Sequence, residues 1–488
     1  MRQVLVGRAD DADPGWTRVL DQERIDHRLG DPTSAPVVVL TGVLPGWVAD
    51  YVSAGGVAVV SGAVASDSFL PSGFSASVTG YTTPGRTRRS HAPSIVTMFE
   101  TEGSGEMRLH EDRVVKYGVD PDCFPAVFTV RHGEGVVVAS GIPLTALLAA
   151  PGDCLRTFCD YSPVTERVAS VDKAAVAETL LSMLGMAFEI AGLPMVTMGR
   201  FPEGASSVLI LRVDVDGVYG DNTRRLASVA ESAGMPASFF LNGDYSRIHP
   251  GPLSGWSASV ELGQHAWLHT LLKTREQNRD NLERAERWMR DDLGVTPRSF
   301  VAPRGLWNRG LGEALRDLGY RYSSDFGLDF DSLPFRADGN VLQVPVHPYS
   351  PERAMAWARE TGAPDPGPRD VRDHYLSAMC EQVRRGRPVH LYGHPEILGE
   401  MAHEVLPSLR ALADELELPR STLGEYADFW IRREQSTPSV GVDESTARLN
   451  IDVAACDVPV QVRSAAAHDL TLNGVPLGRV TSGSFVPT

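Results

Sequence analysis

The chain has 488 residues, more than one hydrophobic core usually serves, so two or three domains are expected. With 42% hydrophobic and 22% charged residues, its composition is that of an ordinary globular protein. The net charge of -16 argues against a nucleic-acid partner, which needs a clustered basic surface, and no run of about 18 apolar residues is present to span a membrane.

The cysteine content and the first residues bear on the compartment. Five cysteines are a sparse and odd set for a disulfide framework, which fits a reducing environment. The opening stretch MRQVLVGRADDADPGW has no apolar segment of signal-peptide length. We therefore expect a cytoplasmic protein, and the sequence gives no indication of its oligomeric state.

Residues 1–195 alternate strand-like apolar runs with helical or loop segments, which predicts an α/β layer with a parallel sheet. The runs are VVVL at Val37, VAVV at Val57 and VVVAS at Val136. The stretch VRHGEGVVVASGIPL, with the helical-looking segment 173–191, resembles class I glutamine-amidotransferase-like or flavodoxin-like domains. An active amidotransferase would need a Cys on a tight strand-to-helix turn, and no Gly-x-Cys-x-Gly occurs. We predict a scaffold or recognition domain without a catalytic Cys.

Residues 196–435 show a more regular alternation of strand and helix signals, after a boundary within LPMVTMGRFPEGASS. Strands are predicted to start at Val208, Ala237, Ser299, Val341 and Val389. Helices are predicted over residues 221–233, 274–293, 311–318, 371–385 and 404–416. A repeat of this kind closes most naturally into a β/α barrel, in which reacting groups gather at the C-terminal ends of the strands.

Residues 436–488 alternate apolar and polar positions around an Asn-Gly pair, Asn473 and Gly474. This is the signal of a β-hairpin with a tight turn. We predict a small β domain that packs on the barrel or forms part of a sandwich and is too short to promise an independent function.

The centre of the chain holds a group of potential metal ligands. Asp214 and Asp216 follow an apolar, strand-like run, and residues two apart on an extended backbone project to the same face. His265 and His269 stand four apart, a spacing that suits one face of a helical turn or the loop that leaves the strand VELGQ. One carboxylate and two imidazoles can hold a divalent transition metal and leave positions open. The second carboxylate would then be free to act as a base.

Each half of this pattern is weak alone, because Asp-x-Asp after a strand is usually turn chemistry and His-x-x-x-His is usually a helix surface. Their order, with two further matching pieces downstream, carries more information. From about residue 202 to 427 the chain resembles the polysaccharide deacetylase (NodB-homology, carbohydrate esterase family 4-like) family. The two further pieces are the third motif at residues 301–305, VAPRG, and His394 in YGHPEIL.

The resemblance implies a distorted β/α barrel with a divalent metal, most simply zinc. It assigns Asp214 as the catalytic base, His394 as the catalytic acid, and as metal ligands Asp216, His265 and His269. The separated carboxylates resemble the branch of peptidoglycan-deacetylase-like and allantoinase-like relatives. The third motif of the family usually begins with an Arg that holds the base, whereas Val301 stands there in this chain. Either Arg304 replaces it or the base has no such support.

Three functions follow from these features. The first is a metal-dependent amide hydrolase that removes an acyl group, most simply acetyl, from an N-acylated sugar or glycan precursor. The second is a hydrolase of another C–N bond, in a cyclic imide, ureide or formamide, and the third is a non-catalytic glycan-binding protein. His390 and His347 are rival candidates for the acid. Side chains beside the motifs could contact substrate, although aromatic ones are more often packing, and they are Arg304, Trp307, Trp267, Phe326 and Tyr392.

Overall fold

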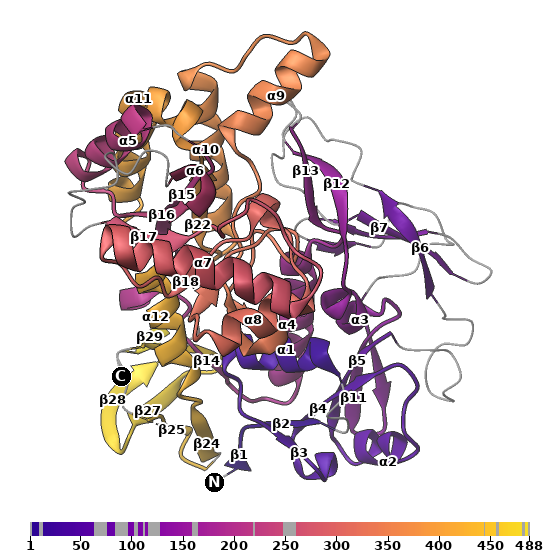
Figure 1. Ribbon diagram of the computed structural model, residues 1–488. Coiled ribbons are helices and arrows are strands. Elements are labelled where there is room, and N and C mark those ends of the chain that lie inside the picture. The colour runs from indigo at the N-terminus through magenta and orange to yellow at the C-terminus, as the bar shows by residue number, and fades with distance from the viewer. Residues whose placement is uncertain are drawn as a thin grey trace.

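The computed structural model describes most of the chain in three connected units (Figure 1). The described residues are 2–8, 13–62, 76–82, 96–101, 106–110, 113–115, 127–158, 164–217, 220–246, 260–443, 445–454, 458–480 and 484–486. The two termini lie at the same end of the molecule, because a strand near the N-terminus joins the C-terminal sheet. None of the described helices combines the length and the apolar character that crossing a bilayer requires.

The N-terminal unit is built on a six-stranded sheet in the order β10-β11-β5-β4-β2-β3. Its neighbours pair in parallel, except for the antiparallel edge strand β10. The five parallel strands follow the order 2-1-3-4-5 of flavodoxin-like sheets. Their bounds are β2 Val6–Arg8, β3 His27–Leu29, β4 Val37–Thr41, β5 Val57–Ser61, β10 Phe128–His132 and β11 Gly135–Ser140. The strands predicted at Val37, Val57 and Val136 are therefore confirmed.

Four helices accompany this sheet: α1 Pro14–Glu23, α2 Trp47–Ser53, α3 Leu144–Ala149 and α4 Lys173–Ile190. A second, antiparallel sheet is inserted between β5 and β10, and it consists of β6 Ala76–Thr82, β7 Val96–Thr101, β8 Glu106–His110 and β9 Arg113–Val115. A separate hairpin, β12 Asp153–Phe158 and β13 Val164–Ala169, leaves the unit and runs up toward helix α9 of the barrel (Figure 1).

The central unit contains a nine-stranded sheet in the order β20-β21-β19-β18-β17-β16-β15-β22, with β23 also beside β15. The strands are β15 Leu209–Val215, β16 Ala237–Leu241, β17 Val260–Gln264, β18 Ser299–Phe300, β19 Tyr322–Ser323, β20 Phe335–Arg336, β21 Leu342–Gln343, β22 Val389–Gly393 and β23 Arg420–Ser421. All pair in parallel except β20. Among the described strands no pairing joins β20 to β22, so the sheet is a curled, open barrel. This confirms the predicted distorted β/α barrel, and the two-residue strands β18, β19 and β21 account for the distortion.

Eight helices surround this sheet: α5 Gly220–Ser232, α6 Gly243–Ser246, α7 Arg275–Leu293, α8 Arg309–Asp317, α9 Pro351–Thr361, α10 Pro368–Arg384, α11 Pro395–Glu415 and α12 Leu423–Glu434. Helix α7 confirms the prediction for residues 274–293. It begins with a capping box between Thr274 and Gln277 and ends at Gly294, which lies in the left-handed region at φ 69°. Helix α11 begins at Pro395, nine residues before the predicted start at Glu404. Its N-cap is therefore His394.

The C-terminal unit consists of two small sheets, and each also contains one strand from an earlier part of the chain. Its own strands are β24 Ser439–Asp443, β25 Arg448–Asp452, β26 Val460–Arg463, β27 His468–Leu472, β28 Val475–Val480 and β29 Ser484–Val486. Asn473 and Gly474 form the turn between β27 and β28, as predicted. Strand β1 (Arg2–Gln3) pairs with β24, and β14 (Met195–Met198) pairs with β26. One hydrophobic core joins all three units, from Trp16 through Trp430 to Val462. The boundaries near 195 and 435 stay predictions.

Candidate active site

Two carboxylates from strand β15 face one cavity of about 450 Å³. Asp214 lies within the strand and Asp216 directly after its last residue, Val215. Both line the cavity, which confirms that residues two apart on this strand project to the same side.

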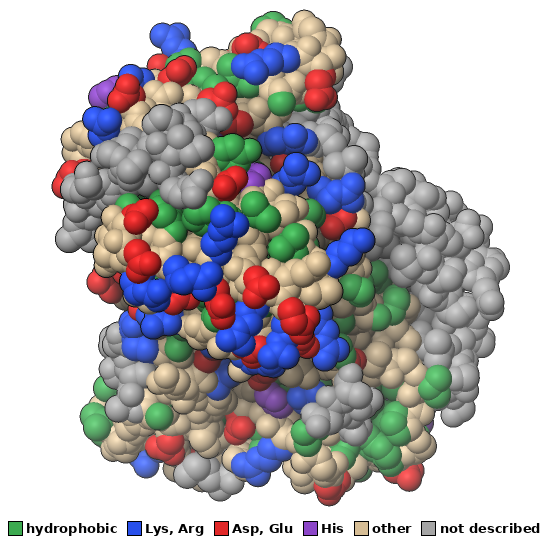
Figure 2. Space-filling view, viewed as in Figure 1, with side chains coloured by type: hydrophobic (Ala, Val, Ile, Leu, Met, Phe, Trp, Pro, Cys, Tyr) green, Lys and Arg blue, Asp and Glu red, His purple; other side chains and the backbone are tan. Residues whose placement is uncertain are grey.

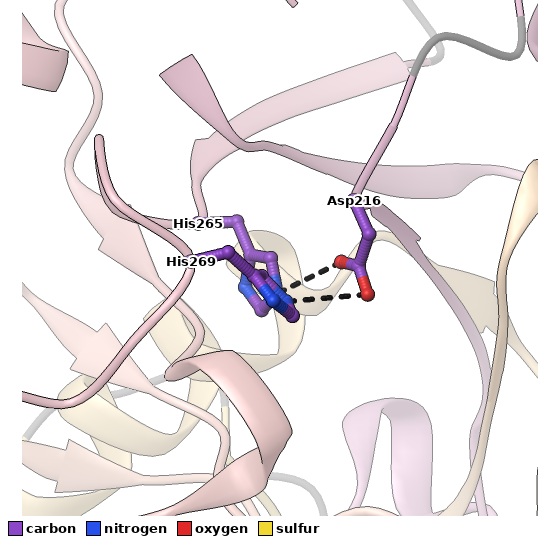
Figure 3. A group of neighbouring side chains, drawn as sticks. All are labelled: Asp216, His265 and His269. Carbon is purple, nitrogen blue, oxygen red and sulfur yellow. Dashed lines mark hydrogen bonds and ion pairs between the residues drawn. The ribbon is translucent and has the colours of Figure 1, made fainter. Parts of the chain in front are cut away.

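The second motif brings two imidazoles to Asp216. The Nε2 atom of His265 lies 3.0 Å from one carboxylate oxygen of Asp216, and the Nε2 atom of His269 lies 3.2 Å from the other. Figure 3 shows both rings turned toward this carboxylate. The two Nε2 atoms are 3.1 Å apart. Asp216 and a histidine pair about fifty residues further along the chain therefore meet at one point, as predicted.

The hydrogen bonds around this cluster fit a divalent cation. The Nδ1 atom of His265 lies 2.8 Å from the carbonyl oxygen of Val301, which can only accept, so Nδ1 carries the proton and Nε2 offers a lone pair. The Oδ1 atom of Asp216 is buried, and its one close polar neighbour among the described residues is the Nε2 atom of His265 at 3.0 Å. One carboxylate oxygen and two imidazole nitrogens within 4.8 Å of one another can all ligate one ion.

The histidine pair sits on a loop and not on a helical turn. His265 follows β17, and no helix begins before Arg275, so the helical alternative was wrong and the loop alternative is confirmed. The side chain of Asn242 donates to the carbonyl oxygen of His265 at 3.1 Å, and that of Asn281 accepts from the N–H of Leu268 at 2.8 Å. These buried amides hold the loop in place of helical hydrogen bonds.

Asp214 is held by Arg212, two residues earlier on the same strand. The Nε atom of Arg212 donates to Asp214 at 2.7 Å and a second guanidinium nitrogen binds the other carboxylate oxygen, so the pair is bidentate. Arg212 is 0% exposed and also donates to the carbonyl oxygen of Ser324 at 2.7 Å. Burial alone would raise the pKa of Asp214, but the charge and hydrogen bonds of Arg212 outweigh it and lower that pKa. Asp214 is thus kept ionised.

Arg304 does not take this place. It lies exposed at the mouth of the cavity with φ 59°, and its guanidinium makes no ion pair or hydrogen bond with any described residue. The third motif contributes through its backbone, because the carbonyl of Val301 orients His265 and the N–H of Ala302 donates to Asp325 at 2.7 Å. Arg212 was missed from the sequence, although an Arg inside an apolar strand, in phase with two Asp residues, was a usable signal.

His394 closes the cluster from the other side. Its Nε2 atom is 3.4 Å from Asp216, and its Nδ1 atom is 3.0 Å from Glu352, in the first turn of α9. The backbone N–H of His394 donates to the second oxygen of Glu352, also at 3.0 Å. Burial would lower the pKa of His394, but Glu352 and Asp216 outweigh it and raise that pKa well above the ordinary value. No motif pointed to Glu352, which lies 42 residues away on a helix that was not predicted.

The comparison with known protein families agrees with these motifs. Residues 203–323, which hold the Asp pair, the His pair and the third motif, match the family model described as polysaccharide deacetylase. The chain contains a polysaccharide deacetylase domain. No curated protein matches the sequence at a significant level.

Among solved structures, the deacetylase domain is similar to several proteins at low identity. A protein assigned as a polysaccharide deacetylase from Mycobacterium smegmatis is 20% identical with a TM-score of 0.40, over 47% of this chain and 91% of that one. A carbohydrate esterase family 4 pseudoenzyme from Bacillus anthracis is 16% identical with a TM-score of 0.33, over 47% and 67% of the two chains. An allantoinase is 14% identical with a TM-score of 0.39, over 48% and 93%.

The two rival histidines lie outside the cavity of the deacetylase domain. His390 is buried inside β22, and burial lowers its pKa to about 3, so its ring is neutral near pH 7 and cannot act as an imidazolium acid. His347 is buried too, with its Nδ1 atom 2.9 Å from Asp331 and its Nε2 atom 3.2 Å from His374. Of the three candidates for the acid, His394 is the one that lies beside Asp216 and lines the cavity.

The aromatic candidates divide into two pairs. Tyr392 and Phe326 line the cavity, and their ring centroids lie 5.7 Å apart. Trp267 is 4% exposed and packs in the core on Trp288, and Trp307 packs against the cluster under α8. Neither tryptophan lines the cavity, so their geometry favours packing over contact with substrate.

Proposed function

We propose that the deacetylase domain is a metal-dependent amide hydrolase that removes an acyl group, most simply acetyl, from an N-acylated sugar. One observation carries the proposal: a three-ligand cluster, an Arg-held carboxylate and a Glu-held imidazole share one cavity. A metal site with a purely structural role would not need the Arg-held carboxylate or the Glu-held imidazole. The exposed thiol of Cys380 and the sparse cysteines support a reducing, cytoplasmic setting, where a soluble sugar precursor is a better substrate than a finished polymer.

The residues divide the chemistry of amide hydrolysis between them. A divalent ion, most simply zinc, held by Asp216, His265 and His269 would polarise the amide carbonyl and acidify a water molecule. Asp214 takes the proton of the attacking water, since Arg212 keeps its carboxylate ionised. His394 gives its Nε2 proton to the departing amine, because Glu352 accepts the hydrogen bond from Nδ1 and favours the charged ring.

Glu352→Gln tests the support of the acid. The carboxylate accepts from both the backbone N–H and Nδ1 of His394, whereas an amide offers one acceptor oxygen, so one donor loses its partner. We expect kcat to fall about 10- to 100-fold, as for other residues that orient a catalytic group. Glu360→Gln, on the exposed face of the same helix, is the control and should leave kcat unchanged. Equal rates for both variants in a deacetylation assay would remove Glu352 from the mechanism.

A substrate panel tests the proposed reaction. Purified protein is incubated with N-acetylated and N-formylated sugars and with small cyclic imides and ureides, before and after chelation and with zinc restored. We expect acetate release from an N-acetylated sugar that stops with chelator and returns with zinc. Opening of an imide without acetate release would favour the second hydrolase, as the separated carboxylates suggest. Binding of sugars without turnover, in protein that takes up no metal, would favour the glycan-binding alternative.

A further inference from the structure

The N-terminal unit supplies part of the cavity wall of the deacetylase domain. Glu166 and Arg167 of strand β13 line the cavity together with Asp214 and His394. The same strand is fixed to the barrel, because the N–H of Ala169 donates to the carbonyl oxygen of Phe326 at 3.1 Å. Val168 and Ala169 also share a buried apolar cluster with the two cavity aromatics, Phe326 and Tyr392. The hairpin of β12 and β13 therefore forms part of the cavity wall and is held there by contacts with the barrel.

Three arginines from three different elements stand at this cavity. They are Arg167 of β13, Arg304 of the third motif and Arg353 in the first turn of α9. The side chains of Arg167 and Arg353 are each 47% exposed, and Arg304 is exposed as well. Figure 2 shows basic side chains beside a histidine just below α9. Such a cluster stands out on a chain whose net charge is -16.

Neighbouring carboxylates orient two of these guanidinium groups. The Nε atom of Arg353 lies 3.2 Å from Glu166, and the NH1 atom of Arg167 lies 2.7 Å from Asp153 on the other strand of the hairpin. Both side chains are nearly half exposed, so their guanidinium groups remain accessible at the cavity. The charge of Arg304 has no counter-ion among the described residues. The cavity is therefore lined by two guanidinium groups that carboxylates hold in place and by Arg304, whose charge no described carboxylate offsets.

We propose that Arg167, Arg304 and Arg353 select a sugar that carries an oxyanion substituent, a carboxylate or a phosphate, next to the ring whose amide is cleaved. Planar guanidinium groups recognise both anions through paired hydrogen bonds. A cavity of about 450 Å³ suits one sugar ring with such a substituent. The inference rests on the proposed function, and it gives the N-terminal hairpin a role in specificity.

The test compares three sugars that differ at one position: N-acetylglucosamine, its 6-phosphate and the corresponding 6-carboxylate, N-acetylglucosaminuronic acid. Binding is measured by calorimetry on the full chain with Asp214→Asn, so that no substrate is consumed. We expect one or both anionic sugars to bind at least about tenfold more tightly than the neutral one, the size of one charge-assisted hydrogen bond. The preference should weaken with added salt. Whichever anion binds better identifies the substituent.

Substitutions in the same background assign the preference to the arginines. Arg167→Gln, Arg353→Gln and Arg304→Asn, the last chosen because Asn tolerates the left-handed φ of 59°, should each reduce it about tenfold. Arg309→Gln is the control, since Arg309 is 81% exposed and pairs with Glu313 outside the cavity. Arg353→Lys keeps the charge and replaces the Gln variant in the comparison if Arg353→Gln unfolds at a lower temperature than the parent chain.

The outcomes separate the inference from the proposed function. Equal binding of the three sugars, no binding of the anionic ones, or a preference that survives all three substitutions would overturn the inference. Acetate release is measured separately with Asp214 restored. Arginine-dependent binding of an anionic sugar without acetate release would uphold the inference and overturn the hydrolase, whereas release from the neutral sugar alone would do the reverse.

Discussion

Replacing Asp214 with Asn is expected to lower kcat by about 10²- to 10⁴-fold, the usual contribution of a general base. An amide of the same shape cannot take the proton of water, but it can keep one hydrogen bond to Arg212. Because Asp214 is not one of the three ligands that meet at the cluster, metal content should stay near that of the parent chain. Acetate release checks the loss of kcat, and metal analysis of the same preparation checks the metal content.

His265→Ala is the complementary variant and should lose both the metal and the activity. His265 supplies one of three ligands and is 1% exposed, so water is a poor replacement for its imidazole. His403→Ala, at an exposed position on α11, is the control and should change neither. Equal metal loss in Asp214→Asn and His265→Ala would mean that the roles of Asp214 and Asp216 are exchanged.

The sequence predicted the residues that short motifs carry. Asp214 and Asp216 are two apart on one strand, and His265 and His269 are four apart on one loop, so local spacing already limits where their side chains can lie. The strand ends that hold them were also recognisable, since β15, β16 and β22 are apolar runs that are buried on both faces of a parallel sheet. Local information was sufficient for this part of the site.

The supporting residues come from segments whose proximity depends on the tertiary fold. Glu352 reaches His394 only because α9 packs beside the end of β22, and Arg167 reaches the cavity only because a hairpin of the N-terminal unit docks on the barrel. Nothing in the spacing along the chain encodes either contact. The start of α11 was placed nine residues late, although Pro395 at its first position is a common helix start.

Substituting Arg212 with Met should destabilise the fold by about 3–5 kcal/mol, the usual cost of leaving one partner of a buried ion pair alone. Both members of this pair are sealed from solvent, since Arg212 is 0% and Asp214 3% exposed. Removal of the guanidinium also leaves the carbonyl of Ser324 without its donor at 2.7 Å. Urea unfolding at neutral pH measures the loss, and kcat should fall as well, because the base loses the group that keeps it ionised.

The double variant Arg212→Met with Asp214→Leu separates charge burial from packing. If the isolated carboxylate causes the instability, removing it should restore a large part of the lost free energy, although activity stays absent. Arg212→Lys should fall between the parent and the Met variant, because one ammonium cannot replace the two parallel hydrogen bonds of the guanidinium. Arg309→Met, which removes a solvent-exposed pair, should change the unfolding midpoint little. An Arg212→Met chain as stable as that control would show that the ion pair with Arg212 does not hold Asp214 in place.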